Sequence, residues 1–77
     1  AKARAYFRKA LAANPRGLDS NFFYGDFLFR QGDYAGAARA LETALAAPAR
    51  PGREVADHGR RAQASALLTE ARAKLRG

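Results

Sequence analysis

The chain has no cysteine, no methionine and no tryptophan, and it contains a single histidine. Without cysteine there is neither a disulfide framework nor a metal–thiolate site, so the redox compartment stays open. No signal-like segment is present, and no apolar run of about eighteen residues, so we expect no membrane span in this segment. Position 1 is not methionine, and the opening AKARAYFRKAL already has a helical pattern. We therefore expect a part of a longer polypeptide.

The groups that catalysis or metal binding would need are sparse. A nucleophilic triad requires a base within reach of its nucleophile, and the only histidine, His58, lies near a predicted helix start. Carboxylates recur regularly at Asp19, Asp26 and Asp33, but without histidine they make a thin ligand set. No glycine-rich phosphate loop is present. We expect a protein that is not an enzyme, with no catalytic residue, no metal site and no cofactor.

Apolar residues recur at three- and four-residue spacings throughout the chain, and the alternation of a strand is found nowhere. A chain of 77 residues buries only about 60 % of the surface that it exposes when unfolded, so its core is thin. Short connectors separate the helical segments. This pattern predicts one all-α domain of antiparallel neighbouring helices.

Turn residues set the expected helix ends. The first helix, 1–13, stops before Asn14-Pro15, because a residue that precedes proline is pushed out of the helical region. Asp19 or Ser20 is expected to cap a second helix that ends at Arg30. Gly32 suits a left-handed position after that helix.

Asp33 suits the N-cap of a third helix, from Tyr34 to about Ala47. The apolar face of this helix is expected to hold Ala37, Ala38, Leu41, Ala44 and Leu45. The segment 49–54 contains proline and glycine and is expected to be a loop. A fourth helix, 55–76, follows it, beginning at Val55 or Asp57. Its predicted apolar set is Val55, Ala62, Ala66, Leu67, Ala71 and Leu75.

An internal repeat is the strongest signal in the sequence. ARAYFRKALAAN, from Ala3, aligns with AARALETALAAP, from Ala37. The offset is about 34 residues, the period of helix–turn–helix units. The middle of the chain has the spacing Asn21-x2-Tyr24-Gly25-x2-Leu28, then Ala37-x3-Leu41, and then Pro48.

This spacing resembles the tetratricopeptide repeat. The resemblance covers about residues 1 to 48, with a half repeat at 1–13 and a complete repeat at 18–48. It departs from the family pattern at Asn21, where a large aromatic residue is expected, and at Pro48, which comes one residue early. The helix 55–76 does not follow the motif and is expected to cap the repeat.

The resemblance implies a right-handed superhelix that acts as a protein–protein interaction scaffold. In this family the first helix of a repeat lines a groove that receives a peptide or a helix of a partner. On a wheel of about 100° per residue, one sector of the second helix faces its own repeat partner and holds Asn21, Tyr24, Gly25 and Leu28. Phe23 and Phe27 are expected to face Tyr6 and Phe7 of the preceding helix. The remaining sector is expected to bind the partner through Phe22, Asp26, Phe29 and Arg30, unless the last helix covers the two phenylalanines.

Two other functions stay open. The net charge of +7 and the pI of about 10.9 attract anionic partners. Arg50, Arg53, Arg60 and Arg61 form the densest basic cluster, although the apolar middle of the last helix suits packing better than nucleic-acid binding. Exposure of Tyr6 and Phe7 would favour a structural segment that self-associates as a homo-oligomer. The segment RPGREVADHGRRA resembles the tails of bacterial cell-envelope proteins with such repeats, which leaves the bacterial cytoplasm and the envelope or periplasm both open.

Overall fold

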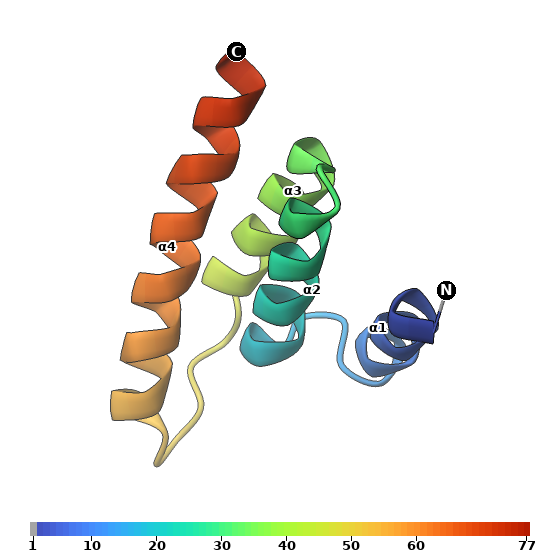
Figure 1. Cartoon of the computed structure of the whole chain (residues 1–77). Coiled ribbons are helices and arrows are strands. Elements are labelled where there is room, and N and C mark those ends of the chain that lie inside the picture. The colour runs from blue at the N-terminus through green and yellow to red at the C-terminus, as the bar shows by residue number, and fades with distance from the viewer. Residues whose placement is uncertain (1) are drawn as a thin grey trace.

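Four helices make up the computed structural model, which describes residues 2–77. They are α1 (Lys2–Ala13), α2 (Leu18–Arg30), α3 (Tyr34–Leu45) and α4 (Glu54–Arg76). The helices α2 and α3 form an antiparallel hairpin, and α4 packs against both (Figure 1). Of the described helices α1 packs only against α2, and it lies oblique to the other three. The all-α class and the helix-turn-helix arrangement are confirmed.

The α2–α3 hairpin is held by a tight turn and by close helix packing. Gly32 has a φ of +84°, the left-handed conformation that was expected of it. The Asp33 carboxylate accepts a hydrogen bond of 2.9 Å from the Gly36 amide and caps α3, as predicted. Further along the hairpin, a Cβ placed on Gly25 would lie 2.8 Å from Cγ of Leu41, which is fully buried. The glycine therefore allows the two helices to approach closely.

The start of α2 differs from the prediction. Neither Asp19 nor Ser20 caps this helix, because it begins at Leu18 with Gly17 as its N-cap and without a side-chain cap bond. Leu18 is 2 % exposed, so burial of its side chain favours a helix that already begins at this residue. Asp19 lies within the first turn, where its carboxylate accepts hydrogen bonds from arginines of later segments. A negative charge there still suits the helix dipole.

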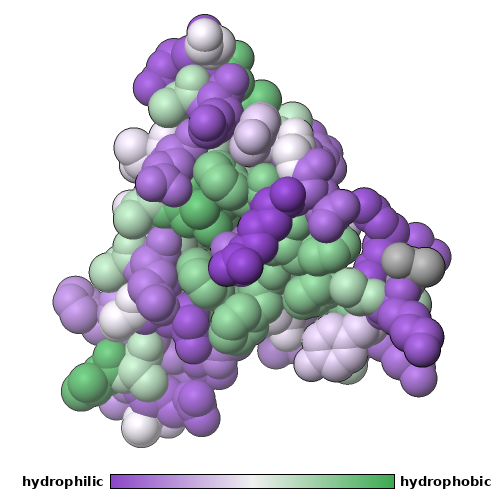
Figure 2. Space-filling model, in the orientation of Figure 1, coloured by the Kyte–Doolittle hydropathy of each residue, from purple (hydrophilic) through white to green (hydrophobic). Residues whose placement is uncertain are grey.

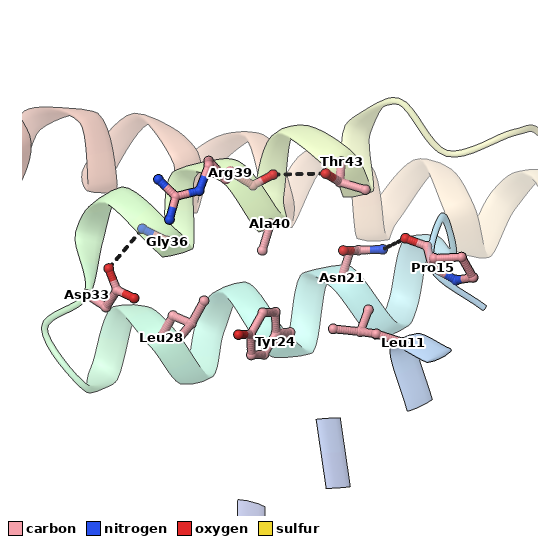
Figure 3. A pocket seen from close by; sticks show the side chains of 10 residues that line it. All are labelled: Leu11, Pro15, Asn21, Tyr24, Leu28, Asp33, Gly36, Arg39, Ala40 and Thr43. Carbon is pink, nitrogen blue, oxygen red and sulfur yellow. Dashed lines mark hydrogen bonds between the residues drawn. The ribbon is translucent and has the colours of Figure 1, made fainter. Parts of the chain in front are cut away.

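Asn21 explains the departure from the aromatic motif position. Its side-chain amide donates hydrogen bonds to the carbonyl oxygens of Pro15 at 3.1 Å and Gly17 at 2.9 Å. The residue is only 5 % exposed, and its amide points at the turn between α1 and α2 (Figure 3). A buried polar group needs such partners. At this position the amide secures the turn instead of filling the core.

The face that α4 turns to the hairpin is not the predicted one. Val55 is 90 % exposed and Leu75 is 53 % exposed, and Ala62 and Ala66 are exposed as well. Of the predicted set, Ala71 is buried and Leu67 is half-buried, and the helix also buries Asp57, Ala64 and Leu68. The prediction left out Ala64 and Leu68, and the buried stripe includes Asp57 because an arginine pairs with it. The face predicted for α3 is correct for its four buried members and half-buried at Leu45.

The connection between α3 and α4 begins earlier in the sequence than expected, and it also ends earlier. The helix α3 ends at Leu45 and not at Ala47, and α4 begins at Glu54, one residue before Val55. The Glu54 carboxylate accepts a 3.1 Å hydrogen bond from the Gly52 amide. Hydrogen bonds from backbone amides lower the pKa of Glu54, and the charge favours the start of the helix.

Candidate partner-binding surface

Three phenylalanines of α2 contact side chains of the flanking helices, and we call them the aromatic row: Phe22, Phe23 and Phe27. Phe22 and Phe27 are half-buried against the core, and Phe23 is the exposed member. The rings of Phe22 and Phe23 meet edge to face, with centroids 5.4 Å apart. On the other side, the Phe27 ring lies 5.2 Å from that of Phe7 in α1. In the space-filling view, apolar residues gather in the middle of one face, over α2 and between α1 and α4 (Figure 2).

Two arginines from the flanking helices lie over the aromatic row. The guanidinium carbon of Arg60, in α4, is 5.1 Å from the Phe22 ring centroid and 4.7 Å from that of Phe23. The guanidinium carbon of Arg4, in α1, is 5.7 Å from the centroid of Phe27. At these distances the cations are attracted to the ring faces. Each neighbouring helix is therefore joined to α2 by a cation and an aromatic ring.

Of the four predicted partner-binding residues, the structure pairs Asp26 with Arg30, and it places Phe22 and Phe29 in separate aromatic contacts. Phe22 belongs to the aromatic row, and the Asp26 carboxylate pairs with Arg30 one helical turn further on, at 3.1 Å. The Arg30 side chain remains 76 % exposed. Phe29 meets the ring of Tyr34, at a centroid distance of 5.2 Å, and both Phe22 and Phe29 are half-buried against the core. The last helix reaches Phe22 through Arg60.

Phe23 was assigned to the wrong neighbour. The residue was expected to face Tyr6 and Phe7, but it is 45 % exposed and contacts Phe22 and Arg60. Among the aromatic residues of α2, Phe27 and Tyr24 meet the Phe7 ring, because α1 crosses α2 obliquely. The contact between Arg4 and Phe27 was also missed. Helical spacing places a residue on a sector of its own helix and does not give the angle of the next helix.

Three of the four arginines of the predicted basic cluster form bonds within the chain. Arg50 donates through Nε to the Asp57 carboxylate at 3.0 Å, and a second nitrogen pairs with the other oxygen of that carboxylate. The same arginine reaches Asp19 at 3.5 Å, and Arg60 reaches Asp19 at 3.2 Å. Hydrogen bonding to Arg50 lowers the pKa of Asp57 and raises the pKa of Arg50. This charge network, Asp19, Arg50, Asp57 and Arg60, fastens α4 to the start of α2.

Arg61 closes the end of α3. Its two terminal nitrogens donate to the carbonyl oxygens of Leu45 and Ala47, each at 2.8 Å. These carbonyls lie at or just after the last turn of α3, where backbone acceptors lack helical partners and cations are favourable. Arg53, the remaining member of the predicted cluster, is exposed at the start of α4. The predicted cluster therefore separates into one arginine that caps α3, two that form ion pairs, and the exposed Arg53.

A separate hollow of about 310 Å³ lies between α2 and α3 beside the end of α1 (Figure 3). Leu11, Tyr24, Leu28 and Ala40 supply its apolar lining. Two of the polar groups around it are already used, since Asn21 bonds to the α1–α2 turn and Asp33 caps α3. Within residues 2–77, no three histidine or acidic side chains lie close enough to hold a metal ion. His58 is exposed.

The arrangement is that of a helical-repeat protein: a helical hairpin with one further helix on either side. The family model of the tetratricopeptide repeat matches residues 1–54. The chain belongs to the tetratricopeptide repeat family, whose domains generally mediate protein–protein interaction and are typically non-catalytic scaffolds. No curated protein and no solved structure matches the chain. None of the helices in the described part is both long and apolar enough to cross a bilayer.

Proposed function

We propose that this chain is an interaction module that holds a peptide or a helix of a partner protein against α2, between α1 and α4. The observation that carries the proposal is the aromatic row, whose member Phe23 is 45 % exposed beside Phe22 and Arg60. On this proposal α1 is the second helix of a half repeat, α2 and α3 form a complete repeat, and α4 closes the stack.

The aromatic row suits binding because its rings are already fixed in place. Phe22 and Phe23 touch each other and Arg60, and Phe27 touches Phe7 and Arg4. A partner that covers them loses little side-chain freedom in α2, and pre-ordered groups bind at lower entropic cost. Burial of large aromatic side chains also supplies much of the energy of protein interfaces.

Polar groups around the row add direction to the contact. Asp26 and Arg30 pair with each other at the surface of α2. Exposed ion pairs of this kind contribute little to folding, so both groups remain able to bond to a partner. The charge network of α4 keeps Arg60 over the row and so maintains one side of the surface.

The proposal is tested with peptides selected from a displayed random library on the immobilised chain. Phe23→Ala is expected to weaken binding of the selected peptides about fivefold or more, as loss of an interface aromatic costs about 1 kcal/mol or more. Val55→Ala is the matched control, because Val55 is 90 % exposed on another element. Circular dichroism checks that both variants fold. Unchanged affinity in both Phe23→Ala and Phe22→Ala would contradict the proposal.

The two other functions have less support from the geometry. A nucleic-acid surface at the predicted basic cluster would compete with the internal bonds of Arg50, Arg60 and Arg61. Self-association rests on Tyr6, which is 68 % exposed in α1. A single exposed tyrosine is an ordinary surface feature, since monomers also expose scattered apolar groups.

A further inference from the structure

The acidic side chains of this protein are almost all engaged within the chain. Asp26, Asp19, Asp57 and Glu42 pair with arginines. Asp33 and Glu54 accept hydrogen bonds from backbone amides. Within residues 2–77 the exception is Glu70. The net charge of +7 therefore belongs to cations whose charge is not matched by a neighbouring carboxylate.

The largest group of those cations lies in α1. Lys2, Arg4, Arg8 and Lys9 are all exposed in this helix. No acidic residue precedes Asp19 in the sequence, and within the described residues none of these four side chains forms an ion pair. A helix with this charge distribution attracts negative charge at its surface.

The cationic helix is directly connected to the aromatic row. Arg4 lies over Phe27, while Phe7, on the same helix, packs against Phe27. A segment lying along the row therefore has aromatic rings beneath it and, on the side of α1, Arg4 and the positive field of that helix. This inference rests on the function proposed above. We propose that the partner segment is acidic, with apolar residues that cover the aromatic row and with aspartates or glutamates that face the cations of α1.

A second copy of this chain does not fit that requirement. Its own net charge is +7, and within residues 2–77 Glu70 is the one carboxylate outside the ion pairs and caps. Its α1 carries the same positive charge and would repel the first. Exposed like charges at short range oppose association.

A nucleic acid fits less well than an acidic protein segment. Single strands bind by stacking successive bases on open aromatic faces. In the aromatic row, Phe22 is overlain by Arg60, and Phe27 by Arg4 and Phe7. Phe23 also has Arg60 over its ring. The row offers an apolar strip with cations at its sides, and not a series of free ring faces.

The inference is tested by sequencing the peptides that the library selection enriches, and by two charge variants. The triple variant Lys2→Gln, Arg8→Gln and Lys9→Gln removes cations of α1 that do not touch the row. The matched control Arg39→Gln, Lys74→Gln and Arg76→Gln removes the same charge from exposed positions elsewhere. We expect enriched peptides with a negative net charge. The α1 variant should bind them severalfold more weakly, since it weakens the positive field of the helix around Arg4, and the control should change affinity much less.

Salt gives a second measurement on the unaltered protein. Binding of the enriched peptides should weaken as the ionic strength rises, because exposed charges are screened. Neutral or basic enriched peptides that still require Phe23 would overturn the acidic preference and leave the proposed function standing. If nothing is enriched over the Phe23→Ala chain, both fall. An oligonucleotide that binds through the same α1 cations more tightly than any peptide would also overturn the inference.

Discussion

At the scale of single residues, two glycines inside helices make a matched pair. Gly25 lies against Leu41, and a Cβ there would be 2.8 Å from Leu41 Cγ and 2.9 Å from Cδ2. Gly59 lies within α4 with no atom within 4 Å of an added Cβ. One glycine is required by helix packing, and the other only weakens its helix.

We expect Gly25→Ala to lower the free energy of unfolding by about 1–2 kcal/mol, because overpacking a buried site costs more than the gain in helix propensity. Gly59→Ala should raise it by about 0.5–1 kcal/mol. Urea denaturation followed by circular dichroism measures both changes. Equal stability of the two variants would show that α2 and α3 are not in close contact at Gly25.

Several residue roles could be predicted from local pattern alone. Gly32 and Asp33 follow from the chemistry of helix ends, which depends only on neighbours in sequence. Asn21, Phe23 and Arg4 could not be placed, because their partners come from a turn or from another helix. The same reason explains the wrong N-cap, since Asp19 is bonded by arginines far along the chain.

At the scale of helices, α4 decides how the hairpin is closed. Its buried stripe runs from Asp57 through Ala64 and Leu68 to Ala71, and Arg61 ties it to the end of α3. The prediction placed Val55 and Leu75 on the buried face of α4, but both are exposed. It failed because the inward face of this helix includes the charged Asp57, so the helix has no clearly apolar side. The stripe depends on pairing between segments, so sequence periodicity predicts that α4 exists but not which way it faces.

Two leucines of α4 test this face. Leu68 is 5 % exposed in the core cluster, whereas Leu75 is 53 % exposed near the end of the helix. Leu68→Ala should lower the free energy of unfolding by about 2–4 kcal/mol, through lost burial and a residual cavity. Leu75→Ala should change it by no more than about 0.5 kcal/mol. Chemical denaturation of both variants measures this, and the reverse order would mean that α4 packs by its other face.

At the scale of the whole molecule, stability is unevenly distributed. The core is formed by α2, α3 and α4, and it includes Leu18, Leu41 and Leu68. The helix α1 has no buried residue and packs only against α2 among the described helices. In repeat proteins each unit is stabilised by its immediate neighbours. A terminal helix with one neighbour therefore opens more easily than the hairpin.

Hydrogen exchange should show this difference directly. We expect the amides of α1 to exchange through local opening, well before those of α2 and α3, which should exchange close to the global unfolding limit. Mass spectrometry or NMR of the free chain separates the two groups, with the amides of α3 as the internal reference. Exchange of α1 at the rate of α3 would show that the helix belongs to the cooperative core.

Because α1 carries the cations proposed to meet an acidic partner, binding of such a segment should slow the hydrogen exchange of α1 more than that of any other helix.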